Sequence, residues 1–362
     1  MSTDPVVLQT QLGVLGTGIA LPGVPLSSAD LVRKAERYLP SGAAALALRI
    51  AKRLHIAERH LVRSFDAAME VPRPLDSSPK ISSRAVLAAL EDADIGVEEL
   101  RTLIGHTTTP HTLLPANIAW VAEELGFGGA HLELRQACTG FAAATMLSTG
   151  LVTSGVSPVA IVGTETGSVF LDAHHIAVDN AQLINFVQMG DGAGAAVLGA
   201  PTDAGGARIE TVFYGSLSGF RKPGISLLQG GSGQPASDGT RTAHFMHDYE
   251  SVRTQGLELL QEGLRVATEA GIAADSVDWW IVHPANGRMA EYASKWLKVR
   301  QERIFCEAAA LGNLGSAAIW VTLDRLRRSG RLAAGDRVLV LGAEASKYMY
   351  GGFLYVHGAS GL

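Results

Sequence analysis

Cys138 is the residue whose type and position most directly suggest chemistry. It stands in the segment 133–141, between the expected end of a strand and the expected start of a helix. Free backbone amides and the positive end of the helix dipole favour a thiolate there, and Gly140 lets another backbone or a ligand come close. The position predicts a nucleophile, and the alternative is a small buried hydrophobic residue. Cys306 lies in the middle of an expected strand, and we interpret it as structural.

Two polar side chains in the second half of the chain could act with such a thiol. His283 closes an expected strand at 277–283, and α/β proteins place their chemistry at the carboxyl ends of strands. Asn313 lies in a turn bounded by glycines, directly before a helix of small residues. Taken singly, each is better explained as a structural residue. Their combination with a reactive cysteine is what indicates a site.

The elements that must position these groups alternate along the chain. Apolar runs bounded by turn residues predict strands at 14–20, 103–109, 131–136, 159–163, 195–198, 208–214, 277–283, 303–307, 337–341 and 351–357. Periodicity and capping residues predict helices at 82–92, 115–125, 138–154, 249–270, 289–298 and 316–328. A further helical region between 28 and 59 is broken near 40–42, and 218–243 is expected to be a long loop.

This alternation indicates an α/β chain with a buried, largely parallel sheet. The alternation of strands and helices occurs twice along the chain, which predicts two βαβαβ halves in a duplicated five-layer arrangement. We place the halves at residues 1–200, with the cysteine, and 206–362, with the histidine and the asparagine. The hinge between them would lie near 201–206.

The composition excludes several classes of protein. Of the 362 residues 47 % are apolar, enough for a sizeable core, and the formal charge of −5 argues against nucleic-acid binding. Two cysteines cannot make a disulfide framework and no signal peptide is visible, so a cytoplasmic location is expected. Residues 136–164 carry no charge, but their polar content and Pro158 favour a buried helix and strand over a membrane span.

Several motifs occur in an order and at spacings that resemble one known family. They are the segments 15–18, 56–60, 107–109 with 114–115, 136–141, 190–198 with its Gly-Asp-Gly-Ala-Gly start, 283–288, and 312–313 with the small-residue helix that follows. Over residues 12–357 the chain resembles the thiolase superfamily, specifically β-ketoacyl-acyl-carrier-protein synthase III and its relatives. The resemblance implies a thiolase-like, five-layered αβαβα fold.

The resemblance also implies a Claisen-type condensation in two stages. Cys138 would accept an acyl group from a CoA or carrier-protein thioester, and backbone N–H groups at Cys138 and near Lys347 would hold the oxyanion. A malonyl-type thioester would then lose CO₂, and His283 and Asn313 would donate hydrogen bonds to the enolate. The reaction implied needs no metal and no cofactor besides the thioester substrates.

Further residues are assigned by the resemblance alone. Arg288, Arg53 and Asn286 match positions at the entrance for the pantetheine arm or CoA, so acyl-CoA or acyl carrier protein is the implied partner. For both arginines the alternative is a solvated surface residue. Leu114 and Phe141 are the implied acyl-pocket residues, and Leu114 matches a bulky residue that reaches across a homodimer interface. Nucleic acid and membrane are not expected as partners.

Three departures from the family's pattern bear on the substrate. Arg49 stands where the family usually has a tryptophan that stacks on adenine, and Pro284 replaces a glutamine. The closing loop, 342–351, lacks the usual run of glycines and carries Glu344 and Lys347, which would narrow the site and change its electrostatics. We therefore expect a specialised relative from a secondary, polyketide-type pathway. Acyl transfer to an oxygen or nitrogen nucleophile is the alternative to C–C bond formation.

Three further interpretations remain open for these residues and for the other histidines. A papain-like protease also has the order Cys, His, Asn, but the signature around its cysteine is absent. A non-catalytic ketosynthase-like subunit would usually have lost the cysteine, which this chain retains. Metal binding at 174–175 or 244–248 lacks cysteine support and a second pair of ligands, which favours ordinary loop or surface histidines.

Overall fold

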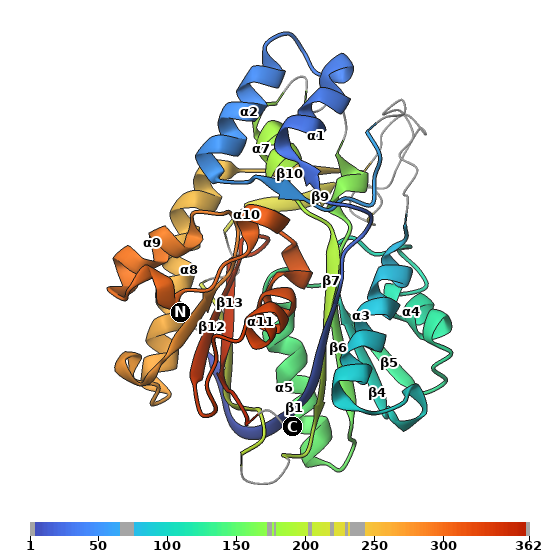
Figure 1. Ribbon diagram of the computed structural model, residues 1–362, viewed down its shortest axis with the longest axis vertical. Helices are drawn as coiled ribbons and strands as arrows, with labels where there is room; N and C mark the ends of the chain where they lie inside the picture. Colours follow the sequence, from blue (N-terminus) through green and yellow to red (C-terminus); the bar gives the residue numbers. More distant parts are fainter. Residues whose placement is uncertain are drawn as a thin grey trace.

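The computed structural model describes residues 4–65, 76–171, 176, 179–201, 205–217, 221–228, 231 and 243–359 (Figure 1). The strands in this part are β1 (Val6–Ala20), β2 (Leu26–Ser27), β3 (Glu58–Arg59), β4 (Thr102–His106), β5 (Ala130–Leu134), β6 (Val159–Glu165), β7 (Gly192–Gly199), β8 (Arg208–Ser216), β9 (Ile225–Leu228), β10 (His244–His247), β11 (Trp279–Val282), β12 (Arg337–Glu344) and β13 (Met349–Val356). The α-helices are α1 (Ser28–Ala35), α2 (Ala43–Leu54), α3 (Ser78–Ala93), α4 (Asn117–Leu125), α5 (Gly140–Thr153), α7 (Asn180–Gln188), α8 (Tyr249–Glu269), α9 (Met289–Leu297), α10 (Ala308–Leu311) and α11 (Ala318–Arg328). Short 3₁₀ segments include η1 (Glu36–Tyr38), η5 (Gln301–Arg303) and η6 (Gly315–Ala317).

The main sheet has nine strands in the order β11-β12-β13-β8-β1-β7-β6-β4-β5. β1 connects its two parts, because its first half pairs with β8 and its second half pairs with β7. The remaining strands form two small pairs, β2 with β3 and β9 with β10.

The sheet is mixed, so the prediction of a largely parallel sheet is wrong. β4 runs parallel to β5 and β6, and β11 runs parallel to β12, but the pairs that involve β1, β7, β8 and β13 are antiparallel. The connection from β12 to β13 shows the reason, since it is only a tight turn at 345–348. A parallel neighbour would have required a crossover of about a dozen residues or more.

The two parts of the sheet repeat one pattern and sandwich two helices. In one part β6 pairs with β4 and β7, and in the other β12 pairs with β11 and β13. α5 contacts β4 and β6 on one side and β8 and β13 on the other, and α11 contacts β7 and β11. α3 and α4 cover the outer face of one part, and α8 and α9 that of the other (Figure 1). This is the five-layered αβαβα arrangement expected from the sequence.

Local sequence signals account for several helix ends. The hydroxyl of Ser27 accepts the N–H of Asp30 at 3.0 Å and caps α1. In the same way the carboxylate of Asp248 accepts the N–H of Ser251 at 3.1 Å and caps α8. Gly126 ends α4 in the left-handed conformation. These short-range contacts explain why most helix boundaries fall near the predicted ones.

Two predicted elements differ from those observed. The strand expected at 303–307 is the end of η5 followed by Ile304, which forms a single parallel bridge to Trp280. The chain leaves the sheet edge there because α10 begins at Ala308. The loop expected at 218–243 contains β9, whereas its residues 218–220, 229–230 and 232–242 lie outside the described part.

The charge-free segment 136–164 forms α5 and most of β6 inside the molecule. β6 is buried along its whole length, and α5 lies between the two parts of the sheet. Among the described residues, no helix combines the length and apolar character needed to cross a membrane.

Candidate active site

Cys138 lies between β5 and α5 and is partly exposed. Its turn is packed tightly on two sides. A Cβ atom on Gly140 would lie 2.4 Å from Nδ1 of His106. One on Gly342 would lie 2.5 Å from the Phe141 ring and 3.1 Å from the carbonyl oxygen of Cys138. Only glycine fits these two positions without displacing a neighbour, so close backbone approach holds the cysteine in place.

The carboxylate of Glu344, the last residue of β12, occupies the start of α5. Its Oε2 accepts hydrogen bonds from the N–H of Thr139 at 3.2 Å and from the Thr139 hydroxyl at 2.7 Å. The hydroxyl of Ser346 donates to the other carboxylate oxygen. Glu344 is only 3 % exposed, so its charge acts on the Cys138 turn with little screening by water.

The electrostatic surroundings of the thiol are therefore opposite to those expected from the sequence. Burial, then the charges of Glu344 and Glu165, raises the pKa of Cys138 well above its ordinary value. The prediction that the helix start favours a thiolate is wrong in this structure. The physical reason is that burial, together with a carboxylate distant in the sequence that bonds to the start of the helix, outweighs the positive end of the helix dipole.

His283 follows β11 directly and is buried. The backbone N–H of His283 donates to the backbone carbonyl of Leu341 at 2.8 Å. The next residue in that strand is Gly342, whose Cα faces the Cys138 carbonyl. Within the described residues its Nδ1 has no hydrogen-bond partner. Burial lowers the pKa of His283 to about 4, so its imidazole is neutral near pH 7.

Asn313 is held by its own turn and by the end of α7. The side-chain Oδ1 of Asn313 accepts the N–H of Gly315 at 3.0 Å, and its backbone N–H donates to the carbonyl of Gln188 at 2.7 Å. The side chain of Gln188 in turn donates to the carbonyl of Ala285 at 2.8 Å. Gln188 therefore links the asparagine turn to the loop that follows His283.

Glu165, at the end of β6, was not singled out from the sequence. Its Oε2 accepts hydrogen bonds from the N–H of Ser316 at 3.1 Å and from the Ser316 hydroxyl at 2.8 Å. Its Oε1 accepts a bond from the hydroxyl of Thr108 at 2.9 Å. A signal was available, because Gly-Thr-Glu at 163–165 and Gly-Ala-Glu at 342–344 both end an apolar strand.

Lys347 lies in the exposed turn between β12 and β13. Its Nζ donates to the carbonyl of Arg221 at 3.0 Å and so extends across the surface. The side chain that approaches the Cys138 turn from this loop is Glu344. Of the two charged residues expected to change the electrostatics of the closing loop, Glu344 is thus the one in contact with the Cys138 turn.

The three expected entrance residues come from two adjoining segments. Arg53 is exposed in the last turn of α2, and the carbonyl of the next residue, Leu54, accepts the N–H of Gly287 at 3.0 Å. Asn286 Oδ1 accepts the N–H of Arg288 at 2.9 Å. The Arg288 guanidinium forms an ion pair of 2.7 Å with Glu291 and lies over the ring of Tyr292.

The two expected acyl-pocket residues lie in contrasting places. Leu114 is 88 % exposed on the loop before α4. Phe141 is 1 % exposed and packs edge-on against Trp320 and Phe353 in the core. A pocket role for Phe141 would require these rings to separate.

The motif at 190–194 has a structural role. Asp191 is buried, and its carboxylate accepts the N–H of Val62 at 2.8 Å and the N–H of Ser168 at 3.1 Å. Burial raises the pKa of Asp191 to about 6. These contacts tie the start of β7 to two neighbouring segments and place Gly190, whose N–H donates to the Asn313 carbonyl at 3.0 Å.

Of the two segments considered for metal binding, 174–175 lies outside the described residues and 244–248 makes structural contacts. In the latter, His247 contacts the Asn185 side chain at 2.7 Å and Asp248 caps α8. No group of three or more candidate metal ligands occurs in the described part of the chain.

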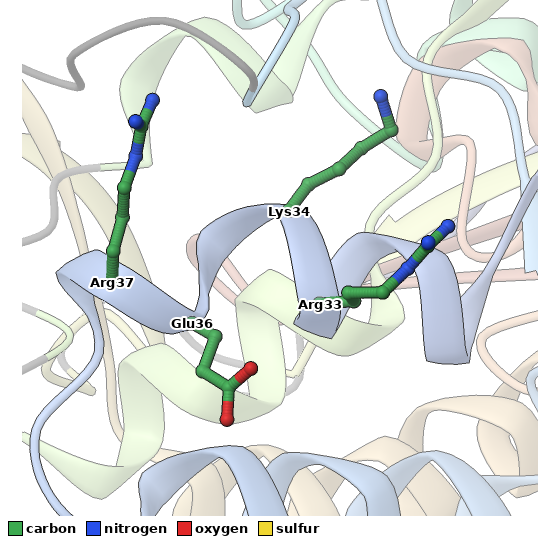
Figure 2. Close-up of a pocket in the computed structure, with 4 residues that line it drawn as sticks. All are labelled: Arg33, Lys34, Glu36 and Arg37. Atoms are coloured by element: carbon green, nitrogen blue, oxygen red, sulfur yellow. The ribbon is translucent and has the colours of Figure 1, made fainter.

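A surface depression lies apart from these residues, on α1 and η1. Arg33, Lys34, Glu36 and Arg37 line it (Figure 2). Lys34 and Arg37 extend to one side of the ribbon and Glu36 to the opposite side (Figure 2). None of the candidate site residues lines this depression, so it adds nothing to the active site.

Known proteins match both halves of this arrangement. The family described as 3-oxoacyl-[acyl-carrier-protein] synthase III matches residues 132–217, and its C-terminal part matches residues 267–355. β-Ketoacyl-[acyl-carrier-protein] synthase III of Desulfitobacterium hafniense is 34 % identical over 347 residues, which cover 91 % of this chain and 93 % of the relative. The chain belongs to the β-ketoacyl-acyl-carrier-protein synthase III family.

Solved structures agree with this family membership. AbyA1, described as a tetronic acid condensing enzyme, superposes with a TM-score of 0.82 at 27 % identity, covering 95 % of this chain and 99 % of AbyA1. The synthase III of Pseudomonas aeruginosa superposes with a TM-score of 0.78 at 25 % identity, covering 96 % and 99 %. The predicted resemblance and the thiolase-like fold class are confirmed. This synthase III family member is an acyltransferase of the ketosynthase type, as predicted.

Proposed function

We propose that Cys138 is the nucleophile of a decarboxylative condensation whose enolate is stabilised by His283 and Asn313. In loading, the Cys138 sulfur attacks the carbonyl carbon of an acyl thioester, and its proton leaves with the departing thiol. In condensation, a malonyl-type thioester loses CO₂, and the enolate carbon attacks the acyl carbon. The sulfur leaves as a thiolate and takes up a proton. The backbone N–H groups of Cys138 and Lys347 would bind the oxyanions.

One observation carries this proposal. Gln188 connects the Asn313 turn to the His283 loop, and His283 bonds to Leu341 beside the Gly342 that faces Cys138. These contacts link the three distant segments that carry the thiol, the imidazole and the carboxamide, which supports the proposal. A neutral imidazole can donate one N–H to an enolate oxygen, and loss of one such donor typically costs ~10²–10³ in rate.

We propose acyl-CoA or acyl carrier protein thioesters as substrates, with no separate cofactor. The curated relatives are named as acyl-carrier-protein synthases. Entry beside Arg53, Asn286 and Arg288 is supported by the contact between the end of α2 and the 284–288 loop. The departures Arg49 and Glu344, and the similarity to the condensing enzyme AbyA1, favour a specialised polyketide-type substrate over a housekeeping one.

We also propose a homodimer in which Leu114 closes the partner's acyl pocket. Leu113 and Leu114 are 63 % and 88 % exposed, which is unusual for adjacent leucines. β5 is the last strand of the sheet, largely exposed, and Leu132 on it is 37 % exposed. An exposed edge strand is a ready surface for a second copy. Sedimentation of Leu114→Asp and Leu132→Lys variants should show dissociation, whereas a monomeric wild-type protein would exclude the dimer.

The two halves of the chain would then have different tasks. We propose residues 1–200 as the half that carries the nucleophile and residues 206–362 as the half that carries the enolate donors. The two unpaired cysteines fit the cytoplasmic location proposed for such an enzyme.

Intact-mass spectrometry with acyl-CoA and acyl-carrier thioesters, with and without malonyl-carrier protein, tests the function. Wild-type protein should gain one acyl group, as should Cys306→Ala, the matched control, and Cys138→Ala should gain none. His283→Ala and Asn313→Ala should still load but should release little CO₂. Loading of Cys138→Ala would remove the nucleophile, and product formation without CO₂ release would favour transfer to an oxygen or nitrogen acceptor. A wild-type protein that loads nothing would favour the non-catalytic subunit.

A further inference from the structure

The duplicated sheet places two glutamates at equivalent positions. In one half His106 of β4 lies opposite Gly163 of β6, and Glu165 follows Gly163 by two residues. In the other half Val282 lies opposite Leu341, so His283 falls level with Gly342, two residues before Glu344. Each glutamate is the last residue of its strand.

The two glutamates make the same contacts in opposite directions. Glu344 of the second half accepts both the N–H and the hydroxyl of Thr139, at the start of the central helix of the first half. Glu165 of the first half accepts both the N–H and the hydroxyl of Ser316, at the start of the central helix of the second half. Each half therefore holds the beginning of the other half's central helix.

These contacts reach two of the proposed active-site residues. Thr139 is the neighbour of Cys138. Ser316 follows Gly315, whose backbone N–H donates to the Asn313 side chain. Gly315 also lies against Glu165, since a Cβ atom on it would stand 2.6 Å from the Oε2 atom of Glu165. Glu344 thus contacts the residue next to Cys138, and Glu165 contacts the residues that hold the Asn313 side chain.

Within the described part of the chain, no ion pair compensates the charges of the two glutamates. Glu165 and Glu344 are 7 % and 3 % exposed, and neither belongs to an ion pair among the described residues. Burying an unpaired carboxylate is costly unless hydrogen bonds satisfy it. Here backbone N–H groups, hydroxyls and helix dipoles supply that stabilisation. The same bonds fix the turns that carry Cys138 and Asn313.

We propose that Glu344 and Glu165 are a reciprocal pair of positioning residues, Glu344 for Cys138 and Glu165 for Asn313. This inference rests on the proposed roles of Cys138 and Asn313. Because Glu344 lies at the start of the helix that follows the cysteine, its charge also disfavours the thiolate of Cys138. Glu165 orients the turn whose amide would meet the enolate.

Several titratable groups besides the two glutamates surround the Cys138 turn. Burial lowers the pKa of the His106 ring, packed against Gly140, to about 3, and that of His283 to about 4, so both rings are neutral near pH 7. Burial raises the pKa of Tyr214, whose hydroxyl accepts a hydrogen bond from the Gln136 side chain, to about 12. Among the described residues, the two carboxylates are the groups whose charge raises the pKa of the thiol.

The test for Glu344 measures the thiol directly and needs no substrate. In Glu344→Gln the amide oxygen can still accept the Thr139 bonds while the charge is lost. The rate of Cys138 alkylation by iodoacetamide, followed by peptide mass spectrometry against pH, should have its inflection at least one unit lower. Below the inflection this corresponds to about tenfold faster alkylation. An unchanged inflection in a folded variant overturns the role of Glu344.

A matched control distinguishes the effect of the Glu344 charge on Cys138 from the effect of replacing any buried glutamate. Glu133 lies one residue before the end of β5 and accepts the N–H at the start of a helix, that of Ile118 in α4 at 2.9 Å. Glu133→Gln should leave the Cys138 inflection unchanged. If Glu344→Gln does not fold, Thr139→Ala replaces it: this variant should load acyl groups more slowly without a lower inflection. Unchanged loading in Thr139→Ala would overturn the positioning role.

The test for Glu165 separates loading from condensation. Glu165→Gln should still accept an acyl group, with a smaller shift of the thiol inflection, but should release CO₂ from malonyl-carrier protein on the order of tenfold more slowly. Condensation at the wild-type rate overturns its role. If wild-type protein never loads an acyl group while the alkylation profiles shift as stated, the proposed function fails and the effect of Glu344 on the thiol stands.

Discussion

Gln188 holds Asn313 from the end of α7: its backbone carbonyl accepts the Asn313 N–H at 2.7 Å. Its side chain donates to the Ala285 carbonyl at 2.8 Å, so one residue links the Asn313 turn to the loop that follows His283. Gln188→Ala keeps the backbone bond to Asn313 and removes the side-chain bond to Ala285. It should load acyl groups normally but condense them about tenfold more slowly, because the Asn313 turn and the loop after His283 lose this link. Product formation by mass spectrometry measures this. Gln182→Ala is the control, since Gln182 donates instead to the Phe245 carbonyl, and equal losses in both variants would contradict the assignment.

Two glycines of α5 should respond oppositely to alanine. In Gly140→Ala the new methyl group would lie 2.4 Å from the His106 ring, so the ring or the Cys138 turn must move, which we expect to cost about 1–3 kcal/mol of unfolding free energy and most acyl loading. Gly150 is exposed in the same helix and has no atom within 4 Å of the added carbon. Gly150→Ala should therefore stabilise by about 0.5–1 kcal/mol. Urea unfolding compares them, and a neutral Gly140→Ala would show that the turn is not tightly packed.

The buried His283 should make stability fall in acid. Burial lowers its pKa to about 4, so between its unfolded pKa of about 6.5 and pH 4 only the unfolded chain binds the proton. Stability is therefore lost as pH falls through this window. The lowered pKa of His106, about 3, acts in the same direction, and the raised pKa of Asp191, about 6, acts in the opposite one.

The contribution of His283 is obtained by difference. Between pH 7 and pH 5, His283→Asn should lose about 2 kcal/mol less unfolding free energy than the wild type, since the other groups are common to both. Urea unfolding at the two pH values measures it, with His131→Asn at an exposed position as the control. Parallel losses in wild type and His283→Asn would mean that the imidazole is already charged in the folded protein.

Arg288 should affect substrate capture more than chemistry. Its backbone N–H donates to Asn286 on the loop at the proposed entrance, and its guanidinium forms an ion pair with Glu291 at 2.7 Å. Arg288→Glu should raise KM for CoA or carrier thioesters about tenfold, because their phosphates are repelled, with little change in kcat. The effect should shrink at high salt. Lys295→Glu, which removes the other partner of Glu291, should change KM much less, and equal changes would place the entrance elsewhere.

Much of the framework could be predicted from local pattern. The segments around Cys138, His283 and Asn313 can be recognised by their residue types at strand ends and turns. Their order indicates the family that the comparisons confirm. Element boundaries follow from caps such as Ser27 and Asp248. The sequence did not predict the mixed sheet, because the periodicity of a strand does not show whether its neighbour runs parallel or antiparallel. The tight turn after β12 makes β13 antiparallel.

The state of the thiol is what tertiary structure alone decided. By sequence, the position of Cys138 at a helix start favours a thiolate, and that inference uses only neighbours along the chain. Glu344 bonds to Thr139 from 205 positions away, and the charge of Glu165, at the end of β6, also raises the pKa of the thiol. Electrostatic energy depends on distance through space, which strand register sets. Local sequence therefore determined which residues are available for chemistry, and only the packing of the two halves decided which charges they meet.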